Sequence, residues 1–80
     1  MEMIISHNGR DWVAENESLR VSAPTLELLD IRLTEKMRAG HMVARGQVKK
    51  VFMAFNNATI PQWIRQYAQH YFNRIVEVRG

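Results

Sequence analysis

The first third of the chain alternates apolar and polar residues with the period of a β-strand. The alternating segments are residues 3–7, 12–15 and 19–22, and polar turn residues separate them. The first turn contains Asn8-Gly9, a dipeptide that tolerates positive φ at both positions and therefore favours a hairpin. The second turn is Asn16-Glu17-Ser18. The pattern predicts three antiparallel strands joined as a meander.

After Pro24 the apolar period changes from that of a strand to that of a helix. Thr25 is a good N-cap, and Gly40 is predicted to be the C′ residue beyond the helix. Four apolar residues fall on one helix face: Leu26, Leu29, Leu33 and Met37. Leu28 and Ile31 fall on the other side, so we expect a second helix or a second subunit to cover them.

The second half of the chain predicts a long strand, a helix and a short last strand. Residues 47–55 are apolar on both alternating faces, so both faces of this strand are expected to be covered. Thr59 and Gln62 form a capping box for a helix from about Pro61 to Asn73. The last strand contains Ile75, Val76 and Val78. The predicted fold is a single α+β domain over residues 1–80, in the order βββαβαβ, with an antiparallel or mixed sheet packed on two helices.

The composition excludes a disulfide-rich protein and a cysteine-ligated metal site. The 80 residues contain no cysteine, which excludes a disulfide framework and a thiolate metal site. The apolar run from Met3 to Ile5 is too short for an export signal or a membrane span. We therefore expect a cytoplasmic protein.

Charge is distributed unevenly between the two halves. Residues 1–35 hold seven acids and three bases, a net charge of −4, whereas residues 36–80 hold eight bases and one acid, a net charge of +7. This imbalance indicates an anionic partner, or contact between the acidic part of one copy and the basic part of another. Folding that mixes both signs over one surface is the alternative.

Candidate catalytic groups are sparse. His7 lies near Asp11 across the predicted hairpin, an arrangement that any hairpin of exposed polar residues produces. His41 and His70 have no neighbouring carboxylate, and there is no HxxxH motif and no glycine-rich phosphate loop. We predict no enzyme activity, no catalytic residue, no cofactor and no metal. A small enzyme or accessory subunit with a pocket around His70 and Tyr71 remains an alternative.

Aromatic residues are concentrated in the second half. Six of the seven lie between Phe52 and Phe72. Trp63, Tyr67 and Tyr71 follow helical spacing, which favours a place in the core, whereas Phe72 lies off that stripe. The leading hypothesis is a non-catalytic interaction module that forms a homodimer or binds a protein. Its predicted partner-binding residues are Leu28, Ile31, Arg65, Gln69 and Phe72.

A group of basic residues supports a second hypothesis, a nucleic-acid-binding or antitoxin-like regulatory protein. Each contact with a phosphate would add a salt-sensitive contribution to binding that does not depend on base sequence. Lys49 and Lys50 are adjacent on a strand and must point to opposite faces. The predicted nucleic-acid-binding residues are Lys36, Arg38, Arg45, Lys49 and Lys50.

The sequence resembles two known protein families. The first part of the chain, about residues 3–38, contains Trp12-Val-Ala-Glu15 and Leu19-Arg-Val-Ser-Ala-Pro-Thr-Leu26. It resembles the start of HicB-like antitoxins, in which antiparallel strands lead into a threonine-capped helix. The whole chain, especially Pro61 to Arg74, looks like a small prokaryotic family of unknown function. The first resemblance implies a fold, and neither implies a substrate, a cofactor or a functional residue.

Overall fold

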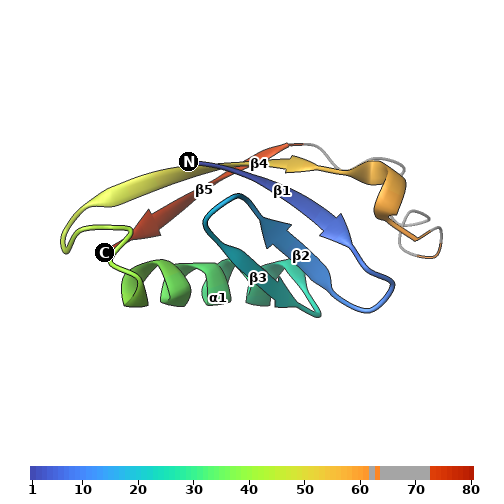
Figure 1. Cartoon of the computed structure of the whole chain (residues 1–80), viewed down its shortest axis with the longest axis horizontal. Helices are drawn as coiled ribbons and strands as arrows, with labels where there is room; N and C mark the ends of the chain where they lie inside the picture. Colours follow the sequence, from blue (N-terminus) through green and yellow to red (C-terminus); the bar gives the residue numbers. More distant parts are fainter. Residues whose placement is uncertain (62, 64–72) are drawn as a thin grey trace.

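The described strands form one twisted sheet that lies against one helix (Figure 1). The computed structural model describes residues 1–61, 63 and 73–80. The strands are β1 (Glu2–His7), β2 (Trp12–Glu15), β3 (Arg20–Ala23), β4 (Val48–Phe55) and β5 (Arg74–Arg79). The helix α1 (Leu26–Ala39) joins β3 to β4, and the short 3-10 helix η1 (Asn57–Thr59) follows β4.

The sheet is mixed, with the strand order β3-β2-β1-β4-β5. The predicted meander is confirmed, since β1 pairs with β2 and β2 with β3 in antiparallel register. The crossover through α1 returns the chain to the free side of β1, so β4 lies parallel to β1, with Met3 beside Met53. β5 then pairs with β4 in antiparallel register. The α+β class is therefore confirmed.

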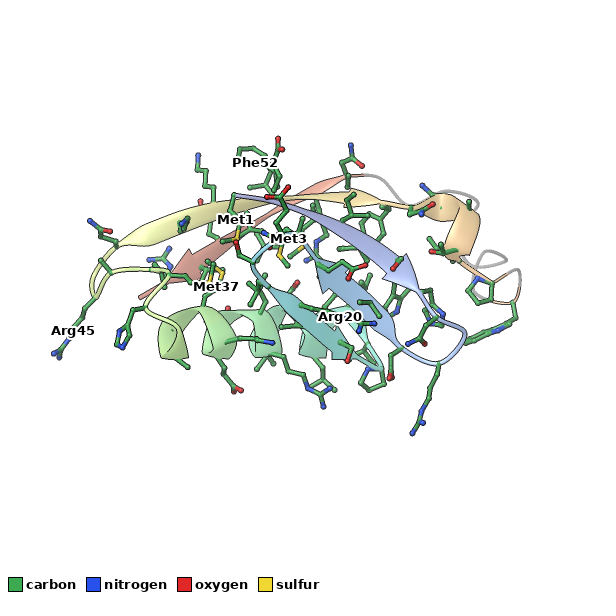
Figure 2. The ribbon with its side chains drawn as sticks, in the orientation of Figure 1. Met1, Met3, Arg20, Met37, Arg45 and Phe52 are labelled. Atoms are coloured by element: carbon green, nitrogen blue, oxygen red, sulfur yellow. The ribbon has the colours of Figure 1, made fainter. Side chains whose placement is uncertain are left out.

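The core lies between α1 and one face of the sheet. Leu29, Leu33 and Met37 are fully buried, as their predicted common face requires. Figure 2 shows Met3 and Met37 between the sheet and the helix. The largest fully buried side chains on the strands are those of Ile5, Val51, Met53 and Val78. Burying each such side chain contributes roughly 1.5–3 kcal/mol, so this layer stabilises the domain.

The ends of α1 follow the prediction at the N-terminus and differ by one residue at the C-terminus. The Thr25 hydroxyl accepts a hydrogen bond from the Leu28 N–H at 3.1 Å, which confirms the N-cap. Gly40 has a φ of −86°, and the next residue, His41, takes the positive φ of 56°. Gly40 is the C-cap rather than the C′ residue, because the helix continues to Ala39 and the Gly40 N–H bonds to the Lys36 carbonyl.

The prediction of packing on two helices is not supported. Among the described residues the sheet packs on α1, and most of the predicted second helix lies in residues 62 and 64–72, outside the described residues. Thr59, the predicted N-cap, is the last residue of η1. Its hydroxyl accepts a hydrogen bond from the His7 N–H at 2.9 Å and donates one to the Asn56 carbonyl at 2.8 Å.

Candidate interaction surfaces

The face of the sheet away from α1 carries a cluster of exposed apolar side chains. Phe52 on β4 is 47% exposed, and its register neighbour Ile75 on β5 is 58% exposed. Ile4 on β1 is 56% exposed and lies beside Ala54 of β4. We call Ile4, Phe52, Ala54 and Ile75 the outer stripe. Figure 2 shows Phe52 on the opposite side of the sheet from Met37. The expectation that both faces of β4 are covered is therefore wrong for this face.

The outer stripe lies in a groove with a volume of about 690 Å³. Three carboxylates flank it, those of Glu2, Glu15 and Glu17, together with Asn16, Asn73 and Arg74. The Asn16 side-chain amide donates to the Glu2 carbonyl at 3.1 Å, which holds the β2–β3 turn beside β1. A groove of this size with an apolar floor and a polar rim is suited to binding an apolar surface or side chain.

The acid–base groups among the described residues that line the groove are the carboxylates of Glu2, Glu15 and Glu17. No histidine, serine, threonine or lysine is among the described residues that line it. Within the described part of the chain, no group of three or more His, Cys, Asp or Glu residues is placed to hold a metal ion.

His7 lies apart from the groove and is buried, not exposed as the predicted polar hairpin implies. It faces the core side, where its ring meets the Trp12 ring edge to face at 4.9 Å and the Trp63 ring at 6.3 Å between centroids. Its Nδ1 accepts a hydrogen bond from the Gly9 N–H at 2.9 Å. Burial lowers the pKa of His7 below 6.5, and the Asp11 carboxylate opposes this lowering in part. These contacts assign His7 a structural role.

The structure describes two of the five predicted partner-binding residues. Leu28 and Ile31 lie on α1 and are 38% and 49% exposed. No described element covers them in the way the sequence led us to expect. Arg65, Gln69 and Phe72 lie outside the described residues, as do His70 and Tyr71. Trp63 is described, and it is exposed rather than part of the core.

The predicted nucleic-acid-binding residues are gathered at one end of the molecule but point in different directions. This end contains the last turn of α1, the following loop with Arg45, and the start of β4 (Figures 1 and 2). Lys36 Nζ donates to the Arg20 carbonyl at 2.6 Å, and Arg38 Nε donates to the Arg79 carbonyl at 2.6 Å. Lys49 Nζ donates to the Met42 carbonyl at 3.3 Å. Lys50 is on the outer face, opposite to Lys49.

Comparison with known sequences places the chain in a family. The sequence model of a family of unknown function, DUF5395, matches residues 1–80. The chain belongs to this family. The expectation of a small prokaryotic family of unknown function is confirmed, whereas the resemblance to HicB-like antitoxins is not confirmed by any comparison.

A relative of this DUF5395 chain is an uncharacterised protein of Archaeoglobus fulgidus. The two are 45% identical over 69 residues, which cover 85% of this chain and 81% of the relative. No solved structure matches the chain. In the described residues, no helix has the length and apolarity needed to cross a membrane.

Sequence reasoning missed the outer stripe, although its signal is present in the chain. Residues 51–55 are apolar at successive positions, and so are Ile4-Ile5 and Ile75-Val76. A strand that is apolar on both faces is usually covered on both. The alternation locates the outer-face residues, but only the layer order of the fold shows that α1 covers just one face of the sheet.

Proposed function

We propose that this protein is a non-catalytic interaction module whose binding surface is the outer stripe. The observation that carries the proposal is the grouping of Ile4, Phe52 and Ile75, each about half exposed, on one regular sheet face. Exposed apolar side chains are common singly, but contiguous ones within a groove indicate a surface that another molecule covers.

The outer stripe is a better binding surface than Leu28 and Ile31. Its residues come from adjacent paired strands, so their positions are held by the sheet and little conformational entropy is lost on binding. Ile31 instead lines a smaller hollow of about 310 Å³, whose other lining residues include Asp30, Glu35, Arg38 and Glu77. Four of the seven described residues that line this hollow are charged, against four of the twelve that line the groove of the outer stripe, so desolvation of charge opposes burial more strongly at Ile31.

Photo-crosslinking tests this choice of surface. Two variants carry p-benzoylphenylalanine, one in place of Phe52 and one in place of Leu28, and each is irradiated in an extract of its own organism. We expect covalent protein adducts from position 52, and we expect the adducts to disappear when Ile75→Glu is added. Position 28 is the matched control, because Leu28 is also an exposed apolar residue.

The outcomes separate the surfaces. Adducts from position 52 alone support the proposal, whereas adducts from position 28 alone move the binding surface to α1 and overturn it. The absence of protein adducts from both positions also overturns it. Thermal unfolding followed by circular dichroism checks that each variant is folded.

Nucleic-acid binding is the second candidate function. The observation that favours it is the gathering of basic residues at one end of the molecule, where Arg79 joins the five residues identified from the sequence. Three of those five, Lys36, Arg38 and Lys49, donate to backbone carbonyls, which limits their freedom to meet phosphates. For this reason it ranks below the outer stripe.

A further inference from the structure

We infer that the partner of the outer stripe is a second copy of this chain, packed face to face with its charges in complementary register. The inference rests on the proposed function, because it names the molecule that covers the same surface. Its basis is the distribution of charge around the stripe.

Glu2 and Glu17 lie at one side of the outer stripe, and Lys50, with Glu77 opposite it in the register, lies at the other. Glu2 is the register neighbour of Phe52 on β1, and Glu17 flanks the groove from the β2–β3 turn. Lys50 lies on the same face of β4 as Phe52, two residues earlier along the strand and therefore displaced toward the basic end. The acidic side and the basic side thus belong to one continuous surface.

These charges lack close partners within the described part of the chain. Glu15 pairs with Arg20 at 3.6 Å, and Arg79 pairs with Glu77 at 3.9 Å. Lys50 stands opposite Glu77 in the register, but among the described residues no ion pair joins Glu2, Glu17 or Lys50 to any group. Two kinds of unpaired charge therefore flank the apolar stripe.

A two-fold axis in the plane between two such sheets brings unlike charges together. In a symmetric interface, when residue i of one copy contacts residue j of the other, residue j of the first also contacts residue i of the second. One contact between Glu17 and Lys50 of the other copy therefore occurs twice. Between these contacts the two outer stripes meet, and apolar sheet faces pack well at a separation of about 10 Å.

A second copy fits this surface better than a partner of a single charge. A uniformly basic partner would meet Glu2 and Glu17 well but would place like charge against Lys50. A uniformly acidic partner would meet Lys50 well but would place like charge against Glu2 and Glu17. A second copy supplies an apolar stripe together with both members of a charge pair, so that Lys50 of each copy meets Glu17 of the other.

A charge-exchange experiment tests the inference. The molar mass is measured by light scattering after size-exclusion chromatography, over roughly 1–300 µM protein at low and moderate salt. We expect a dimer for the natural chain and a monomer for Phe52→Glu. Glu17→Lys and Lys50→Glu should each weaken the dimer at least about fivefold at low salt, and the double variant should recover most of the loss.

Each outcome supports or overturns the inference. Recovery in the double variant supports it, with Leu28→Glu as a control that should leave the dimer unchanged. A natural chain that stays monomeric at the highest concentration overturns it, as does a double variant no tighter than the single ones. If the adducts from position 52 contain only another protein, self-association fails while the proposed function stands. The absence of any adduct at that position removes both.

Discussion

At the scale of single residues, the environment of His7 favours one protonation state. Its Nδ1 accepts the Gly9 N–H, so the neutral ring carries its proton on Nε2. Protonation would place a second N–H against the Gly9 donor and would charge a side chain that is only 6% exposed. Asp11 is the nearby charged group that favours the protonated ring, but burial has the larger effect and lowers the pKa of His7.

This environment predicts that the domain loses stability in mild acid. The folded state binds the His7 proton more weakly than the unfolded chain does, because the folded pKa lies below 6.5. The contribution is therefore fully present above the unfolded pKa and is lost as the pH falls through the folded pKa. Urea unfolding at about pH 7.5 and about pH 5 should show a smaller free energy of unfolding at the lower pH.

His7→Asn is the control for this prediction. An asparagine oxygen can accept the Gly9 N–H without titrating in this range. The loss of stability between the two pH values should be smaller in the variant than in the natural chain. Equal losses would mean that other groups cause the acid sensitivity.

At the scale of elements, the sequence predicted the strands and the first helix because their signals are local. The alternation of β1 to β3 and the Thr25 cap each involve residues close together in the chain. The parallel pairing of β1 with β4 joins residues about fifty positions apart, such as Glu2 and Phe52, and no local pattern encodes it. The C-terminal end of α1 differed by one residue because His41, and not the adjacent glycine, takes the positive φ.

A partly buried ion pair ties α1 to β5. Arg74 Nη2 lies 2.6 Å from Asp30 Oδ2, with the two side chains 33% and 26% exposed. The other carboxylate oxygen, Oδ1, is buried and has no hydrogen-bond partner among the described residues. Among the described residues, the Arg74 guanidinium is therefore the group that offsets the cost of partly burying the Asp30 carboxylate.

Substitutions of Arg74 and Asp30 should have non-additive effects on stability. Arg74→Met leaves a partly buried carboxylate unpaired, and we expect a loss of about 1–3 kcal/mol in the free energy of unfolding. Asp30→Leu combined with Arg74→Met should lose less than the sum of the two single variants. Denaturant unfolding of all four proteins gives the coupling energy, expected at about 0.5–2 kcal/mol. Additive losses would show that the pair contributes nothing of its own.

At the scale of the whole molecule, the sequence located the charges but not the proposed binding surface. The imbalance between halves becomes a basic end in a molecule 40 Å long, because α1, the loop with Arg45 and β4 are consecutive in the chain. The outer stripe combines Ile4, Phe52 and Ile75 from distant parts of the sequence. Its position depends on the strand order, which the composition and the periodicity leave undetermined.

The basic end supports a last prediction, for nucleic-acid binding. A labelled DNA duplex is titrated at about 50 mM and about 200 mM salt, and we expect weak binding that declines steeply at the higher salt. Arg45→Gln should flatten the dependence of log K on log salt by about 0.9, the contribution of one phosphate contact. Arg10→Gln, which removes the same charge from the loop between β1 and β2, should change it little. No binding at the lower salt would eliminate the nucleic-acid hypothesis.

Equal effects of the two substitutions would mean that net charge, and not the basic end, attracts the DNA. Only a localised contact with phosphate distinguishes Arg45 from Arg10.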